Sequence, residues 1–362
     1  MNGFELGDVM GAVWIRDGHG NNWTLLRIVM ALAVLVGHAL IIGERDLAAE
    51  PLVYGRFSIS FMAVNAFFIA SGFLVTASMM HRRDLVEFTS ARVLRIYPAL
   101  VVHVLIVALV VGLANTTLSP SAYLTSAQVW AQFPKVLAFA NTDFLLPGVF
   151  ESNHEPYASA PLWTLRYEVL AYATTAVAFA VGLMRSRWML AVPFVAASLA
   201  MVTLSFLGIY EELPATLSNC VRFAVPYGLG ALFWAYRDEL PLRTWALPMI
   251  VAAAYLSRDW VVGEIMMNLA VGYAIFWLAY AGRARGASKV SDISYGIYIW
   301  HWPILQWMAA QNPAMSTEAL VLAALMLTPL VAYASWRWVE KPMLARKGWL
   351  AERLKRPRLQ PV

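Results

Sequence analysis

Residues 24–42 read TLLRIVMALAVLVGHALII, and Arg27 and His38 are the only ionisable side chains in this run of nineteen residues. A helix that crosses a bilayer needs about 20 consecutive, predominantly apolar residues. The run therefore predicts a membrane-spanning helix. A charged side chain at the centre of such a helix costs on the order of 3 kcal/mol, so both ionisable residues are candidates for a function.

The composition extends this prediction to the whole chain. Of the 362 residues, 60% are hydrophobic and only 14% are charged, whereas soluble domains average about 45–50% and about 25%. The length would allow two domains, but apolar segments recur from end to end, so a single helical bundle is the simpler interpretation. Cys220 is the only cysteine, which excludes an intrachain disulfide.

Ten apolar runs predict an all-α, polytopic integral membrane protein, a bundle of about ten transmembrane helices. The run at 244–256 is the shortest. The predicted spans are residues 24–42, 58–79, 96–114, 162–183, 188–207, 218–236, 244–256, 264–281, 295–310 and 317–338.

Two sets of loops alternate along the chain, one basic and one acidic. The basic loops lie at 81–95, 185–187, 283–289 and 341–358, and the acidic loops lie at 44–50, 143–155 and 211–212. Because cytoplasmic loops carry the excess of Lys and Arg, this alternation predicts a multi-pass protein whose termini are both cytoplasmic. The net charge of +5 then reflects orientation and contact with membrane lipids, and not a nucleic-acid partner.

Three parts follow from these spans: a cytoplasmic lead at 1–23, the bundle at 24–338 and a basic cytoplasmic tail at 339–362. The lead is long and not basic, which argues against a cleaved signal peptide. The outer loop at about 115–161 is too long for a simple hairpin, and loops of this length are usually functional. Within it, 127–140 has the pattern of an amphipathic helix lying at the membrane interface.

Arg27 and His38 are eleven residues apart. At 100° and 1.5 Å per residue they share a helix face and are about 16 Å apart along the axis. With a cytoplasmic N-terminus, Arg27 lies near the inner interface, where it has a function or extends its side chain to the lipid headgroups. His38 lies deeper and needs a partner or a wet cavity. Since histidine titrates near neutrality, it is a ready general base.

Four more ionisable residues stand out near the ends of spans. Arg92 and Arg95 share a helix face; they bind phosphate groups, or they set orientation and contact anionic lipid. Arg166 and Glu168, two apart, point about 200° away from each other, so each needs a partner on another helix. We expect Glu168 to orient His38 or to bind an acceptor; a salt bridge to Arg222 is the simpler alternative.

The chain resembles, over nearly its whole length, the acyltransferase-3 family of membrane-bound O-acyltransferases. Arg27 with His38 fits the family's Arg-x10-His signature, and Arg92 with Arg95 fits its Arg-x-x-Arg signature. Any one such stretch is weak evidence, but six in the right order are strong. The other four stretches read NAFFIASGFL from Asn65, LWTLRYE from Leu162, DISYGIYIWHWP from Asp292 and VEKP from Val339.

The resemblance implies an enzyme that takes an acyl group, often acetyl, from cytoplasmic acyl-CoA and passes it to a hydroxyl of a carbohydrate or glycolipid. It implies no metal. His38 would stand at the reaction centre with Glu168. No hydrolase-like domain follows the last span, so transfer is expected to go directly to the final acceptor. The coenzyme would contact Arg27, Arg92 and Arg95, and the substrates would contact Asn65, Trp163, Arg166, Tyr167 and His301.

Two other classes of function compete with this interpretation. A proton-coupled secondary transporter would use His38, Arg166 and Glu168 as a proton relay, but transporters usually show repeat symmetry and paired broken helices, and the sequence shows no internal repeat. A scaffold protein without chemistry would have no use for several ionisable residues at membrane depth. For His301, within WHWP, we expect a packed ring tied to a neighbour.

Overall fold

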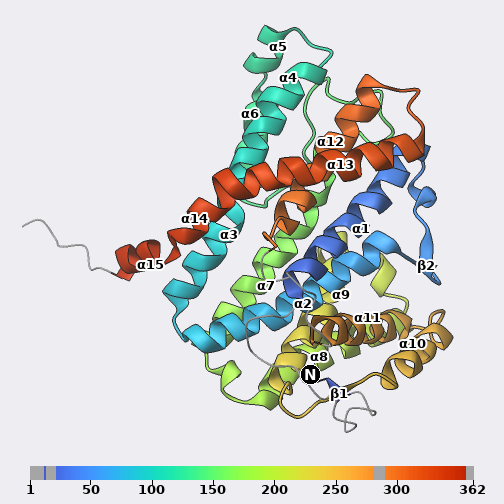
Figure 1. The fold of residues 1–362 in the computed structure, drawn as a ribbon, viewed down its shortest axis with the longest axis vertical. Coiled ribbons are helices and arrows are strands. Elements are labelled where there is room, and N and C mark those ends of the chain that lie inside the picture. The colour runs from blue at the N-terminus through green and yellow to red at the C-terminus, as the bar shows by residue number, and fades with distance from the viewer. Residues whose placement is uncertain (1–11, 14–21, 281–289, 356–362) are drawn as a thin grey trace, which may run out of the picture. The chain divides into compact units, whose positions relative to one another are not determined.

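The computed structural model describes residues 12–13, 22–280 and 290–355. Helices make up most of it (Figure 1). Almost all of the predicted lead, the basic loop with Arg283, Arg285 and Lys289, and the end of the tail from Arg356 lie outside the described residues.

The helices and the short strands follow one another along the chain. The helices are α1 (Trp23–Glu44), α2 (Ile59–Arg82), α3 (Leu85–Ile106), α4 (Gly112–Asn115), α5 (Pro120–Thr125), α6 (Ala127–Leu137), α7 (Trp163–Ala180), α8 (Arg187–Phe206), α9 (Ala215–Ala235), α10 (Ala246–Leu256), α11 (Gly263–Tyr280), α12 (Ser294–Gln311), α13 (Thr317–Ser335), α14 (Lys341–Ala345) and α15 (Lys347–Lys355). The strands are β1 (Ala12–Val13), β2 (Leu52–Tyr54), β3 (Phe57–Ser58) and β4 (Leu242–Arg243), paired β1 with β4 and β2 with β3. Two π-helical turns, Val107–Val111 and Trp336–Glu340, continue α3 and α13.

Each of the ten predicted spans coincides with a helix. Among the residues described, five helical segments are long and apolar enough to cross a membrane, which agrees with a multi-pass helical membrane protein; that all ten helices cross, and that both termini are cytoplasmic, stay predictions. The predicted amphipathic segment at 127–140 forms α6. The five segments are Trp23–Glu44, Ile59–Arg82, Leu85–Asn115, Arg187–Phe206 and Thr317–Lys355.

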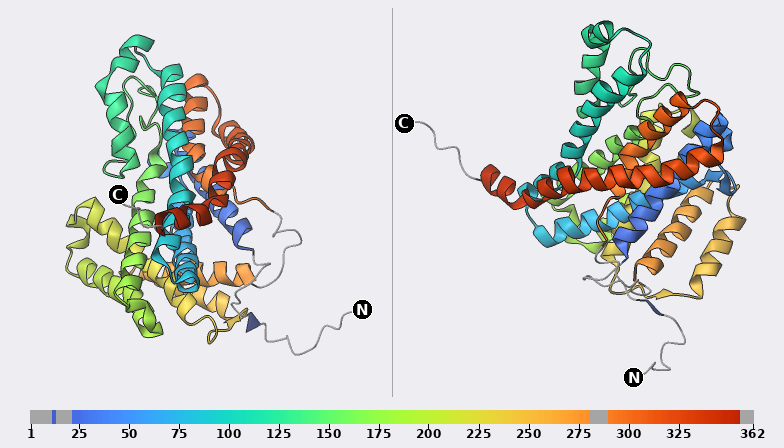
Figure 2. Two further views of the ribbon diagram at one scale, coloured as in Figure 1. Left: turned by 90° about the vertical axis from the view of Figure 1, so that its left-hand side faces the viewer. Right: turned by 45° about the horizontal axis from the view of Figure 1, so that its top comes forward.

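The chain forms two compact units, and the first comprises residues 1–30, 52–80 and 177–290. It holds α8 to α11 and most of α2, with α10 and α11 side by side (Figure 2). α2 and α9 approach closely because glycines stand at the contact. A Cβ on Gly72 would lie 2.0 Å from the carbonyl oxygen of Tyr227, and one on Gly230 would lie 2.0 Å from that of Ile69. Small residues of this kind let the backbones of membrane helices touch.

The second unit comprises residues 31–51, 81–176 and 291–362. Its centre is α12, in which every residue from Ser294 to Gln306 is buried; a helix that is buried on all sides lies in the middle of its bundle. α12 packs on α13 (Figure 1), where a Cβ on Gly296 would lie 2.9 Å from Ala332. At the other end of the unit, α15 packs on α3.

Candidate active site

Helix α12 carries the groups of the candidate site in order along its axis. At 1.5 Å per residue, His301 lies about 9 Å beyond Tyr295, and Ala310 lies about 13 Å beyond His301. Tyr295 is near an arginine cluster, His301 contacts His38, and Ala310 lines a cavity under the outer loop. Helix α12 thus contacts three chemically different groups at successive positions along its axis.

His38 of α1 and His301 of α12 form a stacked pair. His38 Nδ1 lies 2.8 Å from His301 Nε2, and the two ring centroids are 5.1 Å apart. His301 Nδ1 lies 3.0 Å from the carbonyl oxygen of Ile297. A carbonyl only accepts, so His301 Nδ1 carries the hydrogen, and in a neutral ring His301 Nε2 is then the acceptor. His38 Nδ1 must therefore donate, which leaves the lone pair of His38 on Nε2.

This tautomer gives His38 the form that a general base needs. No residue of 22–280 or 290–355 forms a hydrogen bond with His38 Nε2. The edge of Trp302 packs on the His38 ring, with centroids 5.1 Å apart. His301 is 0% exposed, whereas His38 is partly exposed. His38 is therefore the more exposed ring of the pair, and the hydrogen bond that orients it comes from His301 and not from Glu168.

Arg95 of α3 lies in a cluster of carboxylates near the start of α12. Its Nη2 is 2.9 Å from Asp292 Oδ2, and its Nη1 is 3.7 Å from Glu340 Oε2. Glu340 belongs to the π-helical turn, is 1% exposed, and accepts a hydrogen bond from Ser335. The guanidinium also lies over the Tyr295 ring, 5.8 Å from its centroid. Arg95 is thus held from two sides by groups that the protein itself supplies.

Arg92, one turn earlier on α3, has aromatic neighbours. Its guanidinium carbon lies 5.5 Å from the centroid of Tyr172 and 5.8 Å from that of Phe88. The Tyr172 hydroxyl donates a short hydrogen bond to Glu168. Glu168 is therefore linked through Tyr172 to Arg92, on the arginine side of the site.

The other predicted residues of α7 lie around the start of that helix. Arg166 Nη2 donates to the carbonyl oxygen of Ala140 at 3.4 Å, and Trp163 packs edge-on against the buried Tyr167. The residue that ties α7 to α12 is Thr164, whose hydroxyl lies 2.6 Å from that of Tyr298. The sequence did not single out Thr164.

The outer loop is fixed to α12 just beyond the histidine pair. Trp302 Nε1 and Gln306 Nε2 both donate to the carbonyl oxygen of Tyr157, at 2.8 and 3.0 Å. Asn153 Nδ2 donates to Gln306 Oε1 at 2.8 Å. Trp302 therefore contacts both the loop and the ring of His38, so this one side chain packs against the candidate base and holds the loop.

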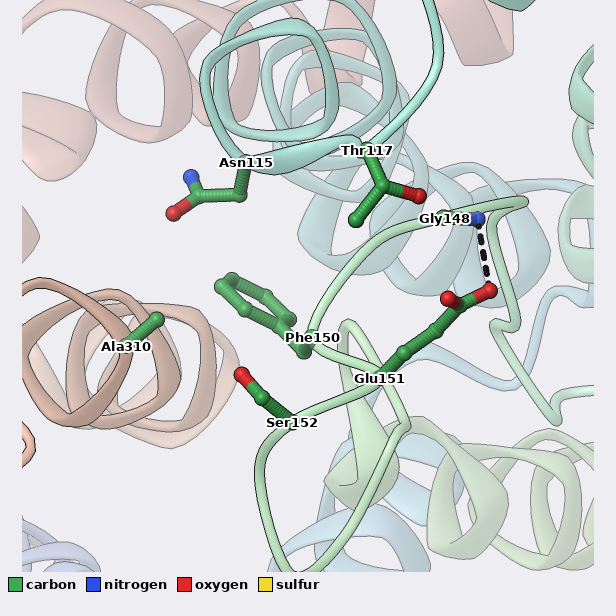
Figure 3. Close-up of a pocket in the computed structure, with 7 residues that line it drawn as sticks. All are labelled: Asn115, Thr117, Gly148, Phe150, Glu151, Ser152 and Ala310. Atoms are coloured by element: carbon green, nitrogen blue, oxygen red, sulfur yellow. Dashed lines mark hydrogen bonds between the residues drawn. The ribbon is translucent and has the colours of Figure 1, made fainter.

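A cavity of about 360 Å³ opens under this loop (Figure 3). Glu151 projects beside it and accepts a hydrogen bond from the Gly148 N–H at 3.2 Å. The backbone of Phe150 has φ of 58°, a strained value for a bulky residue that often marks a functional segment. The wall combines polar side chains with the ring of Phe150 and the methyl group of Ala310. Its residues are Asn115, Thr117, Gly148, Phe150, Glu151, Ser152 and Ala310.

Two predicted site residues belong to the first unit. Arg27 stands near the start of α1, and Asn65 of α2 is 0% exposed and donates to Asn268 of α11 at 3.0 Å. Neither belongs to the group that the second unit brings together around α12. Arg222, the alternative partner of Glu168, donates to Asn65 Oδ1 at 3.4 Å.

Sequence reasoning missed three partners in the second unit: Tyr172, Asp292 and Glu340. Asp292 and Glu340 do lie within the stretches DISYG and VEKP, so the motifs held a signal, but nothing in the sequence paired them with Arg95. His103 lies within the predicted span 96–114. It is fully buried, and its Nε2 lies 3.0 Å from the hydroxyl of Ser159.

Comparison with known proteins points to one chemistry. Residues 21–337 match the profile of an acyltransferase domain. The chain is 25% identical over 356 residues to an O-acetyl transferase of Shigella phage Sf6, covering 91% of this chain and 97% of that protein. No solved structure matches the chain.

Two rhizobial proteins are similarly related. Nodulation protein 10 of Rhizobium leguminosarum bv. viciae is 27% identical over 373 residues, covering 93% of this chain and 97% of that protein. The exopolysaccharide production protein ExoZ of Rhizobium meliloti (strain 1021) is 27% identical over 311 residues, covering 80% of this chain and 92% of that protein.

Proposed function

This chain belongs to the acyltransferase-3 family, and we propose that it transfers an acyl group, acetyl in the first instance, from acyl-CoA to a hydroxyl of a carbohydrate or glycolipid. The observation that carries the proposal is the His38–His301 pair, which leaves a basic nitrogen on a partly exposed ring. The relatives support the substrate classes: one is named an O-acetyl transferase and another an exopolysaccharide production protein.

His38 is the general base in this proposal. Its Nε2 takes the proton of the acceptor hydroxyl as that oxygen attacks the thioester carbonyl carbon. The carbon–sulfur bond then breaks, and the departing thiolate receives the proton from His38. During the step the charged ring keeps its Nδ1–H on His301 Nε2, which stabilises the positive charge. General-base assistance of this kind contributes about 10²–10⁴-fold in rate.

The donor lies on the arginine side of α12. We propose that Arg92 contacts the coenzyme phosphates and that Arg27 belongs to the same donor function. Arg95 is already paired with Asp292 and Glu340, so its part is to hold the start of α12. The Tyr295 ring under Arg95 and His301 are about 9 Å apart along α12, and the coenzyme carries its phosphates and its thioester at opposite ends.

The acceptor lies on the loop side of α12. The cavity beside Phe150 and Glu151 is in the same unit as His38 and lies beyond it on the α12 axis. Glu151 and Ser152 offer hydrogen-bonding groups to sugar hydroxyls. We assign Trp163, Arg166 and Tyr167, at the start of α7, to the same acceptor side. Glu168 accepts a hydrogen bond from Tyr172 of the same helix, and the Tyr172 ring contacts Arg92 of α3.

The remaining features of the proposal are cellular. The protein would lie in a bacterial inner membrane with ten crossings and cytoplasmic termini, so that acyl-CoA reaches the arginines from the cytoplasm. The proton-relay alternative would need His38 to communicate with Glu168; in the part of the chain that the structure describes, His38 contacts His301 and Trp302 instead.

The test is transfer by the purified full chain in lipid nanodiscs. Radiolabelled acetyl-CoA is supplied with a mixture of methyl glycosides of glucose, galactose, mannose and rhamnose, and acetylated glycoside and free coenzyme are counted. The proposal expects label in an ester that mild alkali releases. A protein that binds no acetyl-CoA and releases no coenzyme with any acceptor would refute it.

A further inference from the structure

The first unit holds a chain of buried polar groups that the acyl-transfer proposal does not use. It runs from Arg222 of α9 through Asn65 of α2 to Asn268 of α11. Asn65 and Asn268 are both 0% exposed, and Glu264, one turn before Asn268 on α11, is 8% exposed. Ionisable and amide groups at such depth in a membrane bundle are costly, so they are expected to serve a function.

Arg222 determines the direction of the hydrogen bonds in this series of buried polar groups. Arg222 Nη2 lies 3.4 Å from Asn65 Oδ1, and because a guanidinium can only donate, the oxygen of the Asn65 amide must face it. The Asn65 Nδ2 then donates to Asn268 Oδ1 at 3.0 Å. The Asn268 amide is oriented in turn, with its NH₂ group pointing away from Asn65.

The series of buried polar groups therefore ends in one hydrogen-bond donor, on Asn268, and one acceptor, on Glu264, that have no partner among the described residues. Among the described residues, neither Asn268 Nδ2 nor Glu264 Oε1 has a hydrogen-bond partner, although both atoms are buried. The two residues are four apart on α11, so their side chains are neighbours on one face. The Glu264 carboxyl also lies near Arg222 and Arg56 and within hydrogen-bonding reach of Asn65, which leaves Oε1 as its unpartnered oxygen among the described residues.

A free N–H beside a free carboxylate oxygen matches one functional group in particular. A hydroxyl accepts with its lone pairs and donates its hydrogen, so it satisfies both atoms at once. A carboxylate or phosphate would be repelled by Glu264, and an ammonium would leave the Asn268 N–H without an acceptor. One unpartnered donor beside one unpartnered acceptor therefore favours a neutral hydroxyl group.

We propose that Asn268 and Glu264 form a binding site for a hydroxyl of a neutral sugar, held in the first unit and oriented by the Arg222–Asn65 relay. The inference rests on the proposed function only in taking a carbohydrate as the hydroxyl-bearing ligand. Water has the same hydrogen-bonding groups, so the experiment separates the two sources. Because binding is measured without acyl-CoA, failure of the His38 mechanism would leave this result unaffected.

The experiment uses the full chain in nanodiscs and saturation-transfer NMR with the methyl glycosides of glucose, galactose, mannose and rhamnose. Wild-type protein should transfer saturation to at least one glycoside. Asn268→Asp keeps an acceptor for Asn65 but removes the free donor, so the affinity should fall about tenfold or more, the value of a hydrogen bond that involves a charged group. The double variant Glu264→Gln with Asn268→Asp keeps the charge, exchanges donor and acceptor, and should restore binding.

Thr328→Val is the matched control, because Thr328 is also fully buried with an unpartnered hydroxyl among the described residues, but in the second unit. It should bind glycoside as the wild type does. All variants are compared at matched thermal stability; if Asn268→Asp does not fold, Glu264→Leu removes the acceptor instead and should give the same loss. Absence of saturation transfer in the wild type would mean that the site holds water only. That result, or an affinity of Asn268→Asp for the glycoside equal to that of the wild type, would overturn the proposal.

Discussion

His301 Nε2 receives the Nδ1 hydrogen of His38 across 2.8 Å, and this hydrogen bond determines which nitrogen of His38 is basic. The backbone determines both tautomers: the carbonyl oxygen of Ile297 sets the tautomer of His301, and His301 sets the tautomer of His38. In the proposed mechanism, a fully buried residue is therefore expected to have a large effect on the reaction.

Replacing His301 should slow the reaction without weakening coenzyme binding. In His301→Ala, His38 loses its orienting acceptor and populates both tautomers, so turnover should fall by about ten- to a hundredfold, a fraction of the full general-base contribution. His301→Gln can present an amide oxygen to His38 Nδ1 and should recover part of the loss. Turnover and acetyl-CoA affinity are measured separately. Equal rates in His301→Ala and wild type would show that His301 only packs.

Arg92 is predicted to act on the coenzyme. Arg92→Ala should raise the Kd for acetyl-CoA by about ten- to a hundredfold, the value of about 1.5–3 kcal/mol for a charge-assisted hydrogen bond. Arg92→Lys should recover only part, because lysine lacks the planar fork. Isothermal calorimetry with acetyl-CoA measures this directly, and an unchanged Kd in Arg92→Ala would remove Arg92 from the donor site.

Arg95 should behave differently from Arg92, because it balances two carboxylates. Removing it leaves Glu340 buried without its charge partner, which typically costs about 3–5 kcal/mol. Arg95→Ala should therefore unfold at a lower temperature, and a second change, Glu340→Gln, should restore much of the loss. Thermal unfolding of the single and double variants in nanodiscs decides. If Glu340→Gln gives no recovery, the pair does not stabilise the unit.

The packing of α15 on α3 should depend on acid. Lys355 Nζ lies 2.6 Å from Asp84, which also caps α3, and the hydrogen bond from Lys355 lowers the pKa of the Asp84 carboxyl below its usual 3.8. A depressed folded pKa stabilises the contact above pH 3.8, and this is lost as pH falls through the lower folded value. Hydrogen exchange in α15 should accelerate in that acid window in wild type. Asp84→Asn should show fast exchange already at neutral pH, and a pH-independent wild type would contradict the account.

Much of the fold follows from hydropathy, because apolar runs near 20 residues long can satisfy their backbone only as helices in a bilayer. The ten predicted runs all coincide with helices, and even the amphipathic α6 was found from its pattern. What hydropathy cannot give is the partner of each charge. Arg95 pairs with Asp292 and Glu340, which lie nearly 200 and about 245 residues away in the chain. Such contacts depend on how the helices pack.

The candidate site, like the fold, could be predicted from the sequence only in part. His38 could be identified because an imidazole in the first span is costly and lies on one face with Arg27. The expectation that Glu168 orients it was one of three alternatives, and in the structure Glu168 accepts a hydrogen bond from Tyr172. His301 was expected to be packed and tied to a neighbour; it is buried and bonded to Ile297, but that its neighbour is also His38 could not be predicted from the sequence.

The central claim is tested most directly by single-turnover acetyl transfer in His38→Asn. The asparagine amide can donate to His301 Nε2 in place of Nδ1, so the variant keeps the positioning hydrogen bond and loses only the basic Nε2. Acetyl-CoA is prebound at a concentration below that of the enzyme, methyl glycosides are added, and wild type and variant are matched for thermal stability. The account predicts a rate about 10²–10⁴-fold lower with an unchanged Kd for acetyl-CoA. Transfer by folded His38→Asn at nearly the wild-type rate would contradict it.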